Sequence, residues 1–298
     1  MAPAVATPST RARYMDYTSQ RGFPEDEQSF GDFSVFWLGN RDAASLLVFF
    51  HGGGFMYPAQ AEHLKILGDA YDIAMTRGRD VSIAIVDYGL APASPYPTQL
   101  RQAVAFTNHL LSRRESQSIN FFGDSAGGLL ILMLLLHKAH QHPTIDPLAL
   151  QSGQKFGQAL LLSPSGPIAS SAPSMFQDPP RDFLTLEMLK GMQIGLSNSC
   201  EQGHQVPNEW IAPATAPEEW WIGLPIAEID IILGDDEILR DDILVISDAI
   251  KKHHYSAVNV TVGPNELHIQ PVFDLMKGTT LDSTGTTAMK AWFNSFKG

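Results

Sequence analysis

The fold is decided by His51-Gly52-Gly53-Gly54-Phe55 and Gly123-Asp124-Ser125-Ala126-Gly127. Each stretch lies directly behind a run of strand-forming apolar residues. The second has the form G-x-S-x-G, which makes a sharp turn from strand to helix and exposes the hydroxyl of Ser125. The first is a glycine-rich loop that can aim bare backbone N–H groups at a developing negative charge. In this order, the two predict acyl transfer through a serine nucleophile.

The rest of the chain alternates between short apolar runs and longer helical patterns. This alternation is typical of a mostly parallel central sheet with helices on both faces, so the predicted fold class is α/β. The predicted strands span 46–50, 81–86, 119–122, 156–162, 229–233 and 258–262, and the clearest helices span 100–111, 126–139 and 243–252.

Between residues 163 and 225 the alternation breaks down. This stretch is rich in Ser, Pro and Met, has a helical pattern over 183–194, and carries Trp210, Trp220 and Trp221. An insertion between two core strands predicts a helical lid over about 166–224, with residues 1 to about 43 adding to it. The whole chain, 1–298, is expected to be a single domain.

Composition excludes several kinds of partner. Asp and Glu outnumber Lys and Arg by 32 to 20, and the net charge of −12 argues against nucleic acid and anionic membranes. The single Cys200 excludes an internal disulfide and fits a reducing compartment. No signal peptide is visible at the N-terminus, and the longest apolar stretch, 129–136, is far shorter than the ~20 residues of a membrane span. We therefore expect a cytoplasmic protein.

No cofactor or metal site is expected. His137, His140 and His142 lie close together, but they flank the end of a long apolar helix and no Cys or Glu joins them. The favourable interaction of cations with a helix C-terminus is a sufficient explanation. The glycine run is followed by Phe55 and lacks the G-x-G-x-x-G pattern of dinucleotide sites.

A serine nucleophile needs a general base, and the base needs an orienting carboxylate. In enzymes with this serine turn the order along the chain is Ser, then the acid, then His. Beyond the best acidic loop lie His253, His254 and His268. The first two follow a predicted helix beside two lysines and are interpreted as a solvated helix end. His268 follows the strand predicted over 258–262, where a base belongs.

The acid must come from the loop after the strand at 229–233, where five carboxylates crowd together. Asp241 and Asp242 precede a predicted helix and suit its first turn. Asp235 and Asp236 suit a turn. Glu237 remains, but composition alone does not choose among them.

From about Leu46 onward the chain resembles the hormone-sensitive-lipase-like family of α/β-hydrolases. The resemblance rests on the His-Gly-Gly-Gly-Phe loop, the Asp87-Tyr88-x-Leu90-Ala91-Pro92 turn with Tyr96-Pro97, the Gly-Asp-Ser-Ala-Gly-Gly stretch at 123–128, and Gly-x-x-acid-x-Leu-Arg-Asp from Gly234. It implies an α/β-hydrolase fold and hydrolysis of small or medium acyl esters. In style the chain is most similar to fungal members that trim esters or lactones in secondary metabolism. Relatives often form homodimers.

The resemblance also implies roles for particular residues. The family's acid stands three residues after the glycine, which is Glu237 here. Most relatives carry Asp at this place, so Asp236 stays open as a second candidate. The oxyanion hole would use the N–H groups of Gly53, Gly54 and Ala126. His51 and Gly52 are expected to hold the shape of this loop.

The residues expected to line a substrate pocket come from the predicted lid and from the two stretches that decide the fold. An apolar acyl pocket could be lined by Met175, Phe176, Met188, Met192, Trp220 and Trp221, together with Phe55 and Asp124. The alternative is that the lid residues form the lid's own core. The substrate stays open: a lactonase, thioesterase or amidase would use the same residues. A lyase, cyclase or acyltransferase on this fold is a further alternative. A binding module is another, although the relatives that bind hormones without chemistry have usually lost the histidine, and His268 is present here.

Overall fold

A central eight-stranded sheet organises the molecule. The computed structural model describes residues 7–166, 168, 170–177, 180–253, 257–279 and 281–296. The strands are β1 (Glu27–Ser29), β2 (Ser34–Leu38), β3 (Ser45–Phe50), β4 (Val81–Asp87), β5 (Ile119–Asp124), β6 (Phe156–Leu162), β7 (Ile226–Gly234) and β8 (Ala257–Gly263). Their order across the sheet is β1-β2-β4-β3-β5-β6-β7-β8.

The strand order brings the two decisive loops together. β1 and β2 are antiparallel to their neighbours, whereas the pairs from β4 to β8 are parallel. β3 and β5 are adjacent, and Phe50 at the end of β3 lies opposite Gly123 near the end of β5. The glycine loop and the serine turn therefore leave the same edge of the sheet side by side, where ligands bind in open α/β sheets.

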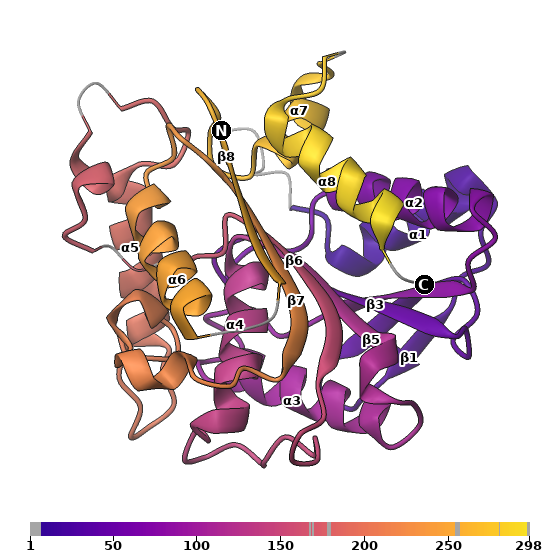
Figure 1. The fold of residues 1–298 in the computed structure, drawn as a ribbon, viewed down its shortest axis with the longest axis horizontal. Helices are drawn as coiled ribbons and strands as arrows, with labels where there is room; N and C mark the ends of the chain where they lie inside the picture. Colours follow the sequence, from indigo (N-terminus) through magenta and orange to yellow (C-terminus); the bar gives the residue numbers. More distant parts are fainter. Residues whose placement is uncertain are drawn as a thin grey trace, which may run out of the picture.

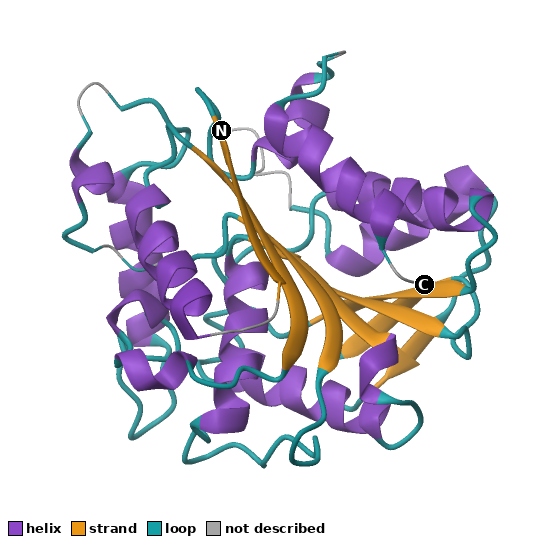
Figure 2. Ribbon diagram, in the orientation of Figure 1, coloured by secondary structure: helices purple, strands orange, loops and turns teal. Residues whose placement is uncertain are grey.

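Helices cover both faces of the sheet (Figures 1 and 2). They are α1 (Thr10–Arg21), α2 (Ala61–Thr76), α3 (Thr98–Leu111), α4 (Ala126–Ala139), α5 (Leu186–Asn198), α6 (Arg240–His253), α7 (Gln270–Lys277) and α8 (Thr284–Ser295). α3, α4 and α6 lie on one face, and α1, α2, α7 and α8 lie on the other (Figure 1). Among the helices of the described ranges, none is both long enough and apolar enough to cross the bilayer.

The core is split by the sheet into two layers. Along β3, Leu46, Val48 and Phe50 pack toward α3 and α4, while Leu47 and Phe49 pack toward α2. All five side chains are buried because both faces are covered. This double coverage explains why the strand has a continuous apolar sequence instead of an alternating one.

The N-terminal part differs from the expectation that residues 1 to about 43 add to the lid. Residues 27–29 and 34–38 form β1 and β2 at the edge of the sheet, and α1 packs against α2. Four of the five residues of β2 are buried, so this strand is held by packing on both of its faces. Strands as short as β1 and β2 carry little periodic signal in a sequence.

The insertion between β6 and β7 contains α5 and three short 3₁₀ helices. These are η2 (Pro173–Phe176), η3 (Pro213–Thr215) and η4 (Glu218–Trp221). α5 lies on the α6 side of the sheet (Figure 1), and its residues line the pocket described below together with those of α7. η4 contacts α4 and α6 instead, away from that pocket.

Candidate active site

Ser125 lies on a strained turn between β5 and α4. Its backbone has φ 50° and ψ −122°, which a non-glycine residue adopts only when its surroundings impose it. The Ser125 N–H donates to the Leu162 carbonyl at 2.8 Å. A Cβ at Gly127 would stand 1.9 Å from the Phe50 carbonyl oxygen, so only glycine lets α4 approach β3 this closely. The turn therefore presents the serine hydroxyl from a fixed position.

His268 lies between β8 and α7, with its ring beside the serine. Its Nε2 is 2.8 Å from Ser125 Oγ, within the range of a nucleophile–base hydrogen bond. The His268 side chain is only 2% exposed. The structure thus brings together the serine and the histidine that the sequence singles out.

Glu237 is the carboxylate that faces His268. Its Oε2 accepts hydrogen bonds from Ser163 Oγ at 2.7 Å and from the Gly234 N–H at 3.0 Å. Its Oε1 lies 3.6 Å from His268 Nδ1, and neither atom has a hydrogen-bond partner elsewhere in the described chain. This separation is slightly long for a hydrogen bond, as is common before a substrate binds.

The other acidic residues of this loop point elsewhere. Asp236 forms an ion pair of 2.9 Å with Arg181. Asp235 and Asp241 both lie near Arg240, at 3.6 and 2.9 Å. The geometry accordingly favours Glu237 over Asp236 as the partner of the histidine.

Ser163 is a supporting residue that the sequence analysis missed. Its hydroxyl donates to Glu237 Oε2 and accepts from the Ile269 N–H at 3.1 Å, so it links the acid loop to the base loop. Its φ of 45° is a second strained position at the edge of the sheet. Nothing in a Leu-Leu-Ser-Pro sequence distinguishes this serine from an ordinary strand end.

The surroundings raise the pKa of His268. Burial alone would lower it, but hydrogen bonding and charge from Glu237, followed by the charges of Asp182 and Asp124, outweigh that effect. These carboxylates stabilise the imidazolium, which is the form that a base reaches after taking the serine proton.

The glycine loop lines the same pocket as the serine. Gly53 and Gly54 have φ values of 109° and 62°, and a Cβ on Gly53 would lie 2.6 Å from the Tyr57 carbonyl oxygen. No acceptor within the described ranges takes the N–H of Gly53, Gly54 or Ala126. These N–H groups are therefore free to donate to an incoming group, which is one requirement of an oxyanion hole.

His51 contacts the glycine loop and holds its shape. Its Nδ1 bonds the Gly52 carbonyl at 2.7 Å, and its ring stacks on Tyr88 with centroids 4.3 Å apart. Burial lowers the pKa of His51 to about 4, so the ring is neutral at pH 7. Its contacts are those of a residue that shapes the loop.

Asp124 joins the serine turn to the glycine loop. Its Oδ1 accepts from the Gly52 N–H at 2.9 Å, and its Oδ2 lies 3.2 Å from His63 Nε2. The Gln60 N–H donates to His63 Nδ1 at 2.9 Å, so Nε2 carries the proton and donates to Asp124. Burial would raise the pKa of Asp124, but His63 and Gly52 outweigh it and lower that pKa. The sequence analysis placed Asp124 in the pocket and missed His63.

A largely apolar pocket of about 330 Å³ opens in front of Ser125. Met188, Leu189 and Met192 of α5 line one side, and Phe273 and Met276 of α7 line the other. The remaining lining residues are Gly52, Gly53, Gly54, Tyr57, Gln60, His63, Asp124, Ser125, Gly166, Phe183, Leu184, Leu239, His268 and Ile269. Met188, Met192 and Asp124 are thus placed in the pocket as expected, whereas the contribution of α7 was missed.

Five other predicted pocket residues lie outside it. Phe55 is buried against Tyr88, and Met175 lines a neighbouring cavity. Phe176 is 61% exposed. Trp220 stacks on His140 at 4.5 Å, and Trp221 belongs to the buried core. The prediction was wrong for these five residues. Met175 and Trp221 belong to the buried core, as the alternative interpretation for the lid residues had it, whereas the exposed Phe176 fills neither the pocket nor the core.

Of the two helix-end histidines, His253 does not line the pocket. His253 lies in the last turn of α6, and its Nε2 is 2.7 Å from Glu218 Oε1. His254 falls outside the described residues.

Comparison with known proteins gives one family and many similar folds. A family model described as alpha/beta hydrolase fold matches residues 47–271. An acetyl esterase of Salmonella schwarzengrund is 28% identical over 103 residues, which cover 33% of this chain and only 30% of that relative. A carboxyl esterase from Tuber melanosporum superposes with a TM-score of 0.73 at 16% identity, covering 99% of this chain and 88% of its own. An esterase from the bacterial hormone-sensitive lipase family superposes with a TM-score of 0.72 at 20% sequence identity, and the match covers 98% of this chain and 92% of that esterase.

Proposed function

The chain belongs to the α/β-hydrolase fold family that matches residues 47–271, and on this premise we propose that it is a serine carboxylesterase acting on small or medium acyl esters. The observation that carries the proposal is the 2.8 Å contact between Ser125 Oγ and His268 Nε2, made on a strand-to-helix turn at the mouth of an apolar pocket. A nucleophile with its base in place beside an acyl-sized cavity is the arrangement that acyl transfer needs.

The proposed mechanism is acyl transfer in two steps. Ser125 attacks the ester carbonyl while His268 takes the hydroxyl proton, and Glu237 stabilises the resulting imidazolium. The N–H groups of Gly53 and Gly54, with that of Ala126, receive the oxyanion. His268 then gives its proton to the departing alcohol. Water repeats the sequence on the acyl-enzyme and releases the acid.

The lining of the pocket supports an uncharged acyl group as the substrate. The side chains that α5 and α7 contribute to the walls are all apolar, and the carboxylate of Asp124 already accepts from Gly52 and lies beside His63. A charged acyl group would lose its hydration there without gaining a partner of opposite charge. The names of the compared proteins, acetyl esterase and carboxyl esterase, agree with this substrate class.

The test is hydrolysis of a p-nitrophenyl ester series from acetyl to palmitoyl by the wild type and by Ser125→Ala. We expect activity on short and medium chains that falls on the order of 10⁴- to 10⁶-fold in the variant. Near-normal activity of Ser125→Ala would contradict the proposal. A wild type that is inactive on every ester, but whose Ser125 still reacts with a fluorophosphonate, would move the assignment to a lactone, thioester or amide, or to a non-hydrolytic reaction.

A further inference from the structure

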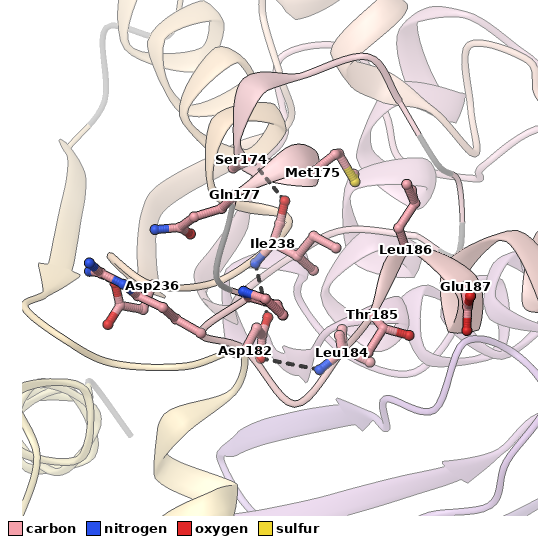
Figure 3. A pocket seen from close by; sticks show the side chains of 12 residues that line it. Ser174, Met175, Gln177, Asp182, Leu184, Thr185, Leu186, Glu187, Asp236 and Ile238 are labelled. Atoms are coloured by element: carbon pink, nitrogen blue, oxygen red, sulfur yellow. Dashed lines mark hydrogen bonds and ion pairs between the residues drawn. The ribbon is translucent and has the colours of Figure 1, made fainter.

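Asp182 lies in the lid segment just before α5, beside the active site and not in it. It lines a cavity of about 250 Å³ next to the pocket, and the two residues that follow it, Phe183 and Leu184, line the pocket itself. Figure 3 shows its carboxylate turned toward the loop of Ile238, which follows Glu237 in the chain. Its position therefore connects the lid with the proposed acid.

The carboxylate accepts hydrogen bonds from backbone N–H groups of separate segments. Oδ2 accepts from Ile238 at 2.9 Å (Figure 3). Oδ1 lies 3.3 Å from the N–H of His268 and 3.4 Å from that of Leu184. One side chain of the lid thereby contacts the residue after the acid and the backbone of the base.

A turn residue would make only the local contact. Asp side chains commonly accept from the N–H two residues ahead, as Asp182 does from Leu184. The other two donors lie 56 and 86 residues away in the chain. These two contacts therefore need an explanation beyond turn formation.

We propose that Asp182 is a positioning residue. Through its carboxylate the lid holds Glu237 and His268 in the relative positions that catalysis requires. The inference rests on the function proposed above. The backbone of His268 has no other tie to the lid among the hydrogen bonds of the described residues. Without the Asp182 contacts, the base loop would still be held by Ser163 at Ile269, by Gln270 at Leu267 and by the Asp236 N–H at the Glu266 carbonyl, but by no hydrogen bond from His268 to the lid among the described residues.

The charge of Asp182 has a second consequence for His268. The ionisable groups that act on the imidazole come from three segments: Glu237 of the acid loop, Asp182 of the lid and Asp124 of the serine turn. Nearby on the lid, Arg181 is paired with Asp236. Since the charge of Asp182 raises the pKa of His268, removal of this charge lowers that pKa. A side chain that only stabilised the fold would leave the titration unchanged.

The test compares Asp182→Asn with Glu187→Gln, which removes an equal charge from the same lid. Glu187 lines the same cavity, but Figure 3 shows its carboxylate far from that of Asp182. For Asp182→Asn we expect kcat to fall about tenfold to hundredfold, because small displacements of reacting groups are costly. KM should change less than about threefold, and the acidic limb of the kcat/KM profile should move to lower pH. Glu187→Gln should match the wild type in all three.

An NMR titration of the His268 imidazole, assigned against His268→Gln, provides a readout that needs no substrate. We expect the pKa of His268 to be lower in Asp182→Asn than in the wild type and to be unchanged in Glu187→Gln. Asp182→Glu keeps the charge but changes the geometry of the contacts. It should lower kcat while the pKa of His268 stays raised.

The outcomes distinguish this inference from the proposed function. An active wild type with unchanged kcat and unchanged His268 titration in Asp182→Asn would overturn the role of Asp182 alone. A fall in kcat in Glu187→Gln as large as that in Asp182→Asn would overturn it too. A third outcome is a wild type without esterase activity, combined with a lower His268 pKa in Asp182→Asn than in the wild type. It would contradict the proposed function but leave the contact between Asp182 and His268 supported.

Discussion

At the scale of single residues, the choice of acid depends on how Glu237 is held. Ser163 and Gly234 occupy its Oε2, which leaves Oε1 to face the Nδ1 of His268. An aspartate at this position would be shorter by one methylene and would need a different loop to reach the ring. The longer side chain therefore agrees with the local geometry.

Replacement of Glu237 by Gln should lower kcat by about 10³- to 10⁴-fold, because the amide cannot stabilise the imidazolium and favours the wrong tautomer. Steady-state kinetics on a p-nitrophenyl ester provides the measurement. The matched control is Asp236→Asn, whose carboxylate pairs with Arg181 and should be dispensable. The opposite pattern, an unchanged kcat in Glu237→Gln and a strongly lowered kcat in Asp236→Asn, would make Asp236 the acid.

The raised pKa of His268 predicts the pH dependence. Only the neutral imidazole accepts the serine proton, so the midpoint of the acidic limb of kcat/KM should lie above the usual histidine value. The same shift stabilises the folded protein at low pH, and this stabilisation is lost as the pH rises through the folded-state pKa. Rates measured across the pH range provide the check. A midpoint at or below the usual value would contradict the electrostatic account.

At the scale of elements, α5 and α7 form the walls of the pocket. Met192→Trp on α5 should fill part of it, so that kcat/KM for octanoyl esters falls more than that for acetyl esters, on the order of tenfold. Ile194→Trp is the control, because Ile194 lies on the same helix, is 60% exposed and does not line the pocket. Equal chain-length profiles for the two variants would show that α5 does not bound the acyl site.

The central elements were predictable from the sequence, and their bounds agree closely. α4 (Ala126–Ala139) and β6 (Phe156–Leu162) have the predicted limits, and β3 and β5 differ by one or two residues. These elements are buried on both sides or follow a glycine turn, so their apolar runs are continuous. The predicted alternation of strands and helices is confirmed by the family match and the sheet.

The peripheral elements were not predictable in the same way. β1 is a three-residue edge strand, β2 is the five-residue strand next to it, and α1 exposes much of its surface, so none of the three carries a clear hydrophobic period. The site shows the same limit. Motifs located Ser125 and His268. In contrast, His63, Ser163 and Asp182 contact the site through hydrogen bonds to residues far away in the chain, and a sequence does not record such contacts.

At the scale of the whole molecule, α8 closes the core on the α2 face of the sheet. Phe293 is 4% exposed and meets Phe122 of β5 edge to face at 5.4 Å. The last helix thus packs directly against a central strand. The C-terminal segment should therefore contribute to global stability although it lies away from the pocket lining.

Phe293→Ala should reduce the free energy of unfolding by about 3–5 kcal/mol, the usual cost of emptying a buried phenylalanine site. Urea denaturation followed by circular dichroism measures it. Lys290→Ala on the same helix breaks only a half-exposed ion pair with Asp282 and should cost less than about 1 kcal/mol. A loss of similar size in both variants would mean that α8 is not part of the cooperative core.

The central claim is that Ser125 is a nucleophile activated by His268. The most direct measurement is mass spectrometry of the intact and digested protein after treatment with a fluorophosphonate, alongside Ser125→Ala and His268→Gln. The account predicts one adduct per chain on the peptide that contains Ser125, no adduct in Ser125→Ala, and labelling slowed by orders of magnitude in His268→Gln. An adduct on another residue, or equally fast labelling of His268→Gln, would contradict it.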